Sequence, residues 1–200
     1  MVQSGLVNNI DVSHFRLSVH LLFAFIILSL IYWNYLSLVN LNTKDKKINN
    51  YIPEFFLLLI FLQITIGAFV SGMDAGKIYN SWPLMGSTYF PDDNNFTNIF
   101  KLSAFSDPSL VQFMHRNLAY VILIFYLFLL IKIYREKLKN LYSAINIVGF
   151  FLIIQIFLGI LTLIYGAQIY LASMHQLSSI FLVSSSVYLL YLNSNQQLSS

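Results

Sequence analysis

Three histidines lie near the beginnings of three long apolar runs, where side chains that can bind a metal are unusual. His115 comes just before the apolar run that starts at Leu118, His175 lies at the start of the last run, and His20 near the start of the first. Ionisable groups are costly inside hydrocarbon, so such residues need a function or a partner. Two neutral imidazoles that face each other across a helical bundle can ligate a haem iron axially. His115 and His175 are therefore candidate haem ligands.

Each of these residues also has a purely structural interpretation. A single histidine in a membrane is commonly a hydrogen-bonded packing contact between helices. The shared depth of His115 and His175, with Arg116 and Gln176 beside them, favours ligation for this pair. Arg116 is placed to pair with a haem propionate at the interface, although it could equally anchor the chain in the outer leaflet. His20 has no obvious second ligand, and ligation and packing remain equally open for it.

The elements that hold these residues are predicted to be transmembrane helices. The chain has 200 residues, of which 58% are hydrophobic and only 10% charged, whereas a soluble domain carries about a quarter charged residues. Five apolar runs approach the ~20 residues needed to cross a bilayer. They lie at about 17–39, 53–72, 110–134, 142–165 and 171–192. We therefore expect an all-α integral membrane protein whose first run is a retained helix and not a signal peptide.

The positive charges indicate how the chain is oriented. Seven of the eleven basic residues follow the first and third runs: Lys44, Lys46, Lys47, Lys132, Arg135, Lys137 and Lys139. The positive-inside rule places these loops and the C-terminus in the cytoplasm, and the N-terminus and the long 73–109 loop outside. This clustering is a topology signal, so no nucleic-acid partner is expected.

The sequence also excludes several kinds of site. The absence of cysteine rules out disulfides, thiolate metal sites and cysteine nucleophiles. No Ser-His-Asp arrangement, P-loop or GxGxxG motif is present, so soluble-type hydrolase and nucleotide-binding functions have no support.

A weak internal repeat suggests how the helices are grouped. Gln63–Gly67 resembles Gln155–Gly159, and Leu17–Leu21 resembles Ala172–Gln176. Such repeats are common in helical membrane proteins. If one half consists of four helices with a histidine on the second and fourth, spans two to five form a complete half. Span one would then be the last helix of another half.

This grouping predicts the organisation of the chain. Residues 1–40 would be a lead-in and the final helix of an N-terminal half, and 41–52 a cytoplasmic loop. Residues 53–193 would form a four-helix haem-binding bundle with the outer loop 73–109, and 194–200 a cytoplasmic tail.

Two further features have open interpretations. The apolar segment Tyr79–Met85 in the long loop could be a lid over the end of the bundle or an aromatic belt at the interface. The glycines around Gly67 and the serines of the last span are typical of close helix packing, and we assign them no chemistry.

Several stretches of the sequence resemble the heme A synthase family of the type shared by alphaproteobacteria and mitochondria. They are residues 67–85, 112–120, 158–163 and 171–176, together with 1–6 and 12–17, so that the resemblance extends over nearly the whole chain. It implies eight transmembrane helices in two pseudo-symmetric four-helix halves, each with a histidine pair facing the outer side. The implied reaction oxidises the C8 methyl of haem O to the formyl of haem A by successive hydroxylations.

The resemblance also implies roles for individual residues. A haem b would be held by His115 and His175, and the substrate haem would lie in the N-terminal half with His20 as one ligand. About three N-terminal helices of the family pattern would lie outside this sequence, with the partner of His20 and a catalytic acidic residue of the first outer loop. The cysteine pairs of other family branches are absent, as expected for this type.

The resemblance further implies partners and a location. The substrate would be haem O, the interacting enzyme haem O synthase (protohaem farnesyltransferase), and the location the inner (plasma) membrane. Two alternatives come from other classes. A non-enzymatic bis-histidine b-type cytochrome or haem-handling assembly factor would use the same histidine pair. A transporter would need broken helices and ionisable groups near mid-membrane, whereas the charges here cluster at the helix ends.

Overall fold

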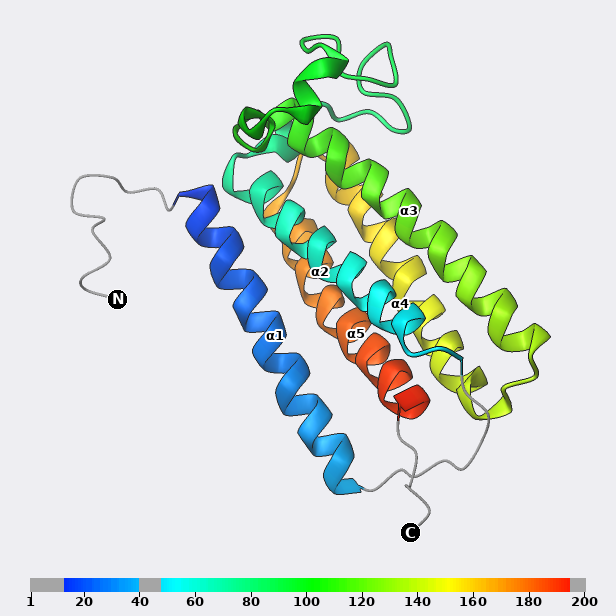
Figure 1. The fold of residues 1–200 in the computed structure, drawn as a ribbon. Helices are drawn as coiled ribbons and strands as arrows, with labels where there is room; N and C mark the ends of the chain where they lie inside the picture. The colour runs from blue at the N-terminus through cyan, green and yellow to red at the C-terminus, as the bar shows by residue number, and fades with distance from the viewer. Residues whose placement is uncertain (1–12, 40–47, 195–200) are drawn as a thin grey trace, which may run out of the picture.

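The computed structural model describes residues 13–39 and 48–194, and within them five long helices account for most of the chain (Figure 1). These are α1 (His14–Val39), α2 (Tyr51–Gly72), α3 (Pro108–Arg135), α4 (Lys139–Ile164) and α5 (Ile169–Ser194). Each is long and apolar enough to cross a membrane. The chain is therefore an all-α integral membrane protein, and the five predicted spans are confirmed. Lys44, Lys46 and Lys47, which were predicted to lie in a cytoplasmic loop, fall outside the described residues. So does the predicted cytoplasmic tail after residue 194.

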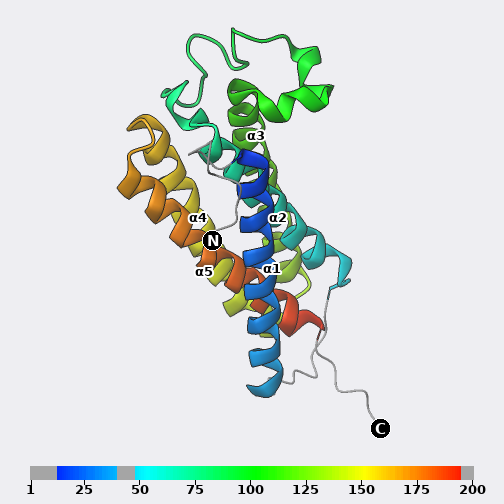
Figure 2. The ribbon, with the colours of Figure 1, turned by 90° about the vertical axis from the view of Figure 1, so that its left-hand side faces the viewer.

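Four of the helices form a bundle and the fifth lies at its edge. Going around the bundle, α2 contacts α3, α3 contacts α4, α4 contacts α5, and α5 contacts α2. The helices α3 and α5, which carry the two candidate ligands, therefore stand diagonally across the bundle. Helix α1 packs on α2 and α5 and lies along one side, as two perpendicular views show (Figures 1 and 2). The further expectation that α1 belongs to a separate half remains a prediction.

All five helices begin before the predicted apolar runs, because hydropathy marks only the lipid-facing length whereas capping sets where a helix begins. At α3 the Asp107 carboxylate accepts a hydrogen bond from the backbone N–H of Leu110 at 3.1 Å, and Pro108 occupies the first turn. Both features are favourable at a helix N-terminus. The helix therefore begins two residues before the expected position 110. Likewise α2 begins at Tyr51, and Pro53 falls within its first turn.

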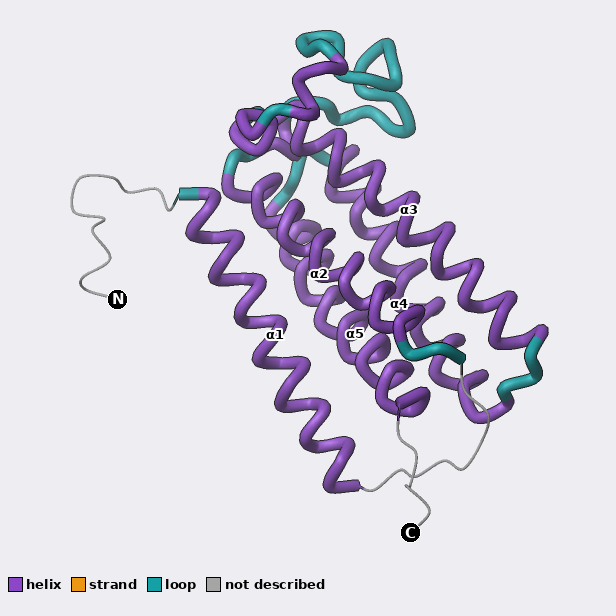
Figure 3. The backbone as a smooth tube through the Cα atoms, in the orientation of Figure 1, coloured by secondary structure: helices purple, strands orange, loops and turns teal. Residues whose placement is uncertain are grey.

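The long connection between α2 and α3, expected to be an outer loop, contains three short 3-10 helices. They are η1 (Ala75–Lys77), η2 (Phe96–Phe100) and η3 (Leu102–Ser106). Figure 3 shows this connection, with its short helical pieces, capping the end of the bundle where α3 begins. We call this end of the molecule the loop end, and the opposite one the far end.

The apolar core lies mainly away from the loop end. Its largest cluster includes the fully buried Phe56, Leu129, Ile145, Val183 and Leu189. Towards the loop end there is only a small second cluster, formed by Ile66, Phe69 and Val111. The bundle is thus held by apolar packing along most of its length, and at the loop end buried apolar residues such as Leu110 and Met85 accompany the polar Gln112.

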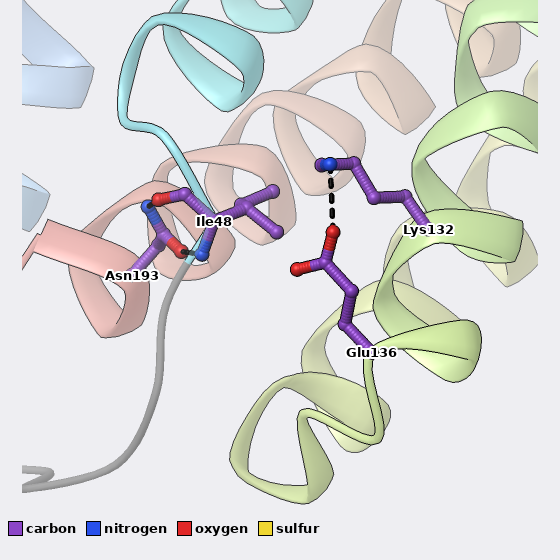
Figure 4. A network of polar contacts seen from close by, with 4 residues as sticks. All are labelled: Ile48, Lys132, Glu136 and Asn193. Atoms are coloured by element: carbon purple, nitrogen blue, oxygen red, sulfur yellow. Dashed lines mark hydrogen bonds and ion pairs between the residues drawn. The ribbon is translucent and has the colours of Figure 1, made fainter.

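A polar clamp joins the start of α2 to the end of α5 at the far end. The buried Asn193 side chain accepts a hydrogen bond from the backbone N–H of Ile48 at 3.0 Å and donates to its carbonyl at 3.0 Å. It also donates to Asn50 Oδ1 at 2.8 Å. Figure 4 shows this clamp near the ion pair between Lys132 and Glu136, 2.7 Å long, at the end of α3.

Replacing Asn193 with alanine should destabilise the protein, because both backbone groups of the buried Ile48 would lose their partner. An unsatisfied buried polar group costs about 1–3 kcal/mol, so we expect a clear fall in thermal stability in detergent. The control is Asn34→Ala, since Asn34 is exposed and bonds only a carbonyl of its own helix. Equal melting temperatures for the two variants would contradict the clamp.

Candidate functional site

His115 on α3 lies against Gln63 on α2. Gln63 Nε2 is 3.3 Å from His115 Nε2, and it also donates to the backbone carbonyl of His115 at 3.0 Å. A carbonyl oxygen can only accept, so the amide must present its nitrogen on this side. The amide N–H therefore faces the ring, and His115 Nε2 is the nitrogen that carries the lone pair.

His175 on α5 has the same arrangement with Gln155 on α4. Gln155 Nε2 is 3.4 Å from His175 Nε2 and donates to the backbone carbonyl of His175 at 3.1 Å. The same reasoning makes His175 Nε2 an acceptor. Two imidazoles on diagonal helices are thus held in the same tautomer, with unprotonated Nε2 atoms.

A glycine makes room for each of these rings. Gly67 and Gly159 lie four residues after the two glutamines, one helical turn further along the same face. A Cβ atom on either glycine would lie 3.0 Å from Cε1 of the neighbouring histidine, closer than ordinary van der Waals contact. At these two positions glycine therefore serves to admit an imidazole, whereas close helix packing was expected for Gly67.

The structure thus explains the internal repeat. The two segments that resemble each other, Gln63–Gly67 and Gln155–Gly159, each build one wall of a histidine pocket. Sequence reasoning found the repeat but gave its glutamines no role. The signal that could have identified them is the recurrence of glutamine and glycine at a spacing of four residues on the helix that precedes each ligand histidine.

The three histidines lie at matching positions along parallel helices. His20, His115 and His175 come six, seven and six residues after the first residues of α1, α3 and α5, about 10 Å at the rise of an α-helix. This is nearly two helical turns in each case. His20 is exposed on α1 at the edge of the bundle, apart from the other two.

Each pocket also leaves the second ring nitrogen of its histidine unsatisfied. Nδ1 of His115 and of His175 is buried without a hydrogen-bond partner, a situation that is rare in folded proteins. No cluster of three or more histidine, cysteine, aspartate or glutamate side chains occurs among residues 13–39 and 48–194. A pair of histidines suits a haem, whose porphyrin supplies the other iron ligands. The side chains present therefore fit an axially ligated haem.

Arg116 holds the long loop onto the bundle. Its Nη1 donates to the backbone carbonyls of Ser81 at 2.9 Å and Leu84 at 3.2 Å, and its Nη2 donates to that of Tyr79 at 2.9 Å. Gln112, one turn earlier on α3, donates to the same Tyr79 carbonyl at 3.1 Å. In this structure the guanidinium thus orders the loop, and pairing with a haem propionate remains a prediction.

Other side chains extend this attachment to both sides of the bundle. Trp82 Nε1 donates to the Tyr120 hydroxyl on α3 at 3.1 Å. On the other side, Asn80 donates to the carbonyl of Leu163 at the end of α4 at 2.8 Å. The segment 79–85 therefore lies across the end of the bundle between two of its helices. Of the two interpretations offered by the sequence, this geometry favours the lid.

Arg116→Lys should loosen this lid while preserving the positive charge. Lysine has one nitrogen in place of the planar fork, so it cannot reach three carbonyls at once. Each lost hydrogen bond to a charged donor costs about 1.5–3 kcal/mol, and amides of residues 79–85 should exchange faster in hydrogen–deuterium exchange. Arg135→Lys, an exposed change at the far end, is the control. Unaltered exchange in Arg116→Lys would show that the fork does not hold the lid.

The lid also contains a tyrosine with a shifted pKa. Burial, the hydrogen bond to Asp92 and the charge of Asp93 together raise the pKa of Tyr79 from 10.0 to about 12. The Tyr79 hydroxyl donates to Asp92 Oδ1 at 2.6 Å. The stability from protonated Tyr79 is then fully present below about pH 10 and is lost as the pH rises from about 10 to 12.

We expect Asp92→Asn to lower the pKa of Tyr79, since the amide removes the carboxylate charge that opposes ionisation of the phenol. The difference in tyrosinate absorbance between each protein and the same protein carrying Tyr79→Phe isolates this one group. A Tyr79 titration that is identical with and without Asp92→Asn would rule out the carboxylate as a cause.

Comparisons with known proteins agree with the motif resemblance. A family profile described as "Cytochrome oxidase assembly protein" matches residues 1–187. The chain is similar to the Heme A synthase of Pelagibacter ubique, with 46% identity over 195 residues, 98% of this chain and 57% of that protein. It is 38% identical over 199 residues to the Heme A synthase of Flavobacterium johnsoniae, covering 96% of this chain and 58% of that protein. The Heme A synthase of Rickettsia bellii is 39% identical over 189 residues, 92% of this chain and 56% of that protein.

These matches confirm the resemblance that the motifs indicated. The chain spans a little over half the length of the curated relatives that it matches. No solved structure matches this chain.

Proposed function

Because the chain belongs to the cytochrome oxidase assembly protein family, we propose that it takes part in haem A biosynthesis as the haem b-holding part of a heme A synthase. The observation that carries this proposal is the duplicated pocket. In each copy a histidine on one helix is oriented by a glutamine on the preceding helix and admitted by a glycine one turn further on.

His115 and His175 would hold the haem b from diagonal helices. The glutamine N–H groups select the tautomer in which Nε2 carries the lone pair, and a bound iron would replace this contact while each glutamine keeps its hydrogen bond to the backbone carbonyl of the histidine. When bound, the haem would supply reversible one-electron transfer. The lid over the same end of the bundle would limit the access of water, and Arg116 would meet a propionate at this level.

The proposed reaction of the whole enzyme is the oxidation of the C8 methyl of haem O to a formyl by successive hydroxylations. What supports it for this chain is the extended similarity to proteins named Heme A synthase. His20 would contact the substrate haem. Its exposure on α1, at the same distance from the helix start as His175, suits a ligand for a second pocket built against this helix.

We further propose that the loop end faces outward from the plasma membrane and that the far end is cytoplasmic. Within the described residues, the short connection between α3 and α4 at the far end carries Lys137 and is flanked by Arg135 and Lys139, as the positive-inside rule requires for a cytoplasmic segment. Haem O synthase is the proposed partner, because it supplies the substrate.

The alternative is a non-enzymatic bis-histidine cytochrome or haem-handling assembly factor. One observation supports it. Helices α2–α5 contain both pockets, in which a glutamine faces a histidine, whereas His20 is exposed on α1 and faces no such glutamine among the described residues. A transporter is not favoured, because α2–α5 each run without a break.

Removing either pocket histidine should abolish the haem b signal. We expect a low-spin b-type reduced-minus-oxidised spectrum in the purified chain, lost in His115→Ala and in His175→Ala, because six-coordinate low-spin iron needs both axial ligands. His20→Ala should keep this signal, since His20 lies outside the two pockets.

A folded wild-type chain without haem, or a full signal in both alanine variants, would sink the assignment. The same cells separate the enzyme from the alternative. Haem A in extracts of cells that also make haem O supports the synthase, whereas haem b and haem O alone support the cytochrome.

A further inference from the structure

The two histidine pockets differ at the second atom of the glutamine amide. In the α4–α5 pocket, Gln155 Oε1 accepts a hydrogen bond from the hydroxyl of Ser178. In the α2–α3 pocket, Gln63 Oε1 is buried and has no partner. The difference follows from the sequence, because Ser178 lies three residues after His175 whereas Leu118 lies three residues after His115. The otherwise repeated design is therefore asymmetric.

Ser178 is distinct from its serine neighbours. It donates to Gln155 and lies 2.9 Å from the carbonyl of His175, which ties the ligand and its glutamine together. By contrast, Ser179, Ser185 and Ser186 donate to backbone carbonyls of their own helix. Among the hydrogen bonds of the described residues, Ser178 is thus the serine of α5 that reaches a side chain on another helix.

This contact changes how firmly the amide is held. The Gln155 amide is bonded at its nitrogen, to His175, and at its oxygen, to Ser178. The Gln63 amide is bonded at its nitrogen alone. A buried carbonyl oxygen without a donor is unfavourable, and an amide held at one end keeps torsional freedom that one held at both ends has lost.

We propose that Ser178 is a positioning residue that fixes Gln155 and, through it, His175, so that the two axial histidines are held unequally. His175 is the fixed ligand, and His115 is the one that an external ligand displaces first. This inference rests on the proposed haem b site. It adds that His115 leaves the iron more easily than His175. Residues that orient a metal-ligating histidine commonly change metal affinity 10- to 100-fold when replaced.

The test compares four variants of the full chain loaded with haem b. Ser178→Ala removes the hydroxyl, and Ser178→Thr retains it. Leu118→Ser introduces a hydroxyl at the matching position beside Gln63. Ser179→Ala, which removes a neighbouring buried hydroxyl bonded only to its own helix, is the matched control. The readouts are the rate at which added cyanide displaces an axial histidine of the oxidised protein and the low-spin EPR spectrum, which is sensitive to imidazole orientation.

We expect Ser178→Ala to change the EPR spectrum, because His175 loses its support, but to raise the cyanide rate little, because that rate is already set by His115 in the wild type. Ser178→Thr should behave as wild type. Leu118→Ser should exchange more slowly, because it gives the Gln63 oxygen a donor. Ser179→Ala should match wild type in both readouts.

Two different failures can be told apart. If the wild-type chain shows no bis-histidine haem, or keeps it after loss of His115 and His175, the proposed function fails and this inference with it. If the haem pair is established but Ser178→Ala and Leu118→Ser both behave like Ser179→Ala, the positioning role of Ser178 is overturned alone. Circular dichroism confirms that each variant is folded before it is compared.

Discussion

The central constraint in this protein is the placing of a neutral imidazole inside a transmembrane bundle with its lone-pair nitrogen next to a hydrogen-bond donor. Hydrocarbon offers no hydrogen-bond partners, so another helix must supply one. Here the supplier is a glutamine, whose amide nitrogen bridges the ring and the backbone carbonyl of the same histidine. Since that carbonyl can only accept, it orients the amide, and the amide in turn sets the tautomer of the ring.

The surrounding structure is arranged around this requirement. Glycine one turn beyond each glutamine lets the imidazole approach the helix backbone. Dense apolar packing occupies the part of the bundle away from the loop end, which fixes the helix positions without competing for the polar region. At the loop end, Arg116 and Gln112 hold the lid through backbone carbonyls. A lid attached by its backbone keeps its own side chains available for other contacts.

The repeat gives the bundle two pockets of the same design, and Ser178 in one copy against Leu118 in the other makes them unequal. A serine in one copy supplies the donor that the other lacks. The two pockets therefore share the contact between glutamine and histidine but differ in whether a hydroxyl bonds the glutamine oxygen. Family membership and the duplicated pocket are thus two independent observations that point to haem. The helix at the edge, α1, carries its exposed histidine at a matching distance from its start.

The sequence by itself determined the number of membrane helices, the place of the three histidines near the starts of three of them and the repeat of glutamine and glycine, because hydropathy and residue spacing are local properties of the chain. It could not decide that Gln63 meets His115 or that Gln155 meets His175, since either glutamine could have faced lipid. It also could not separate Ser178 from the other serines of α5, or show that Arg116 binds three carbonyls of the lid. Those outcomes depend on which helices are neighbours and how each is rotated about its axis, and only tertiary packing sets both.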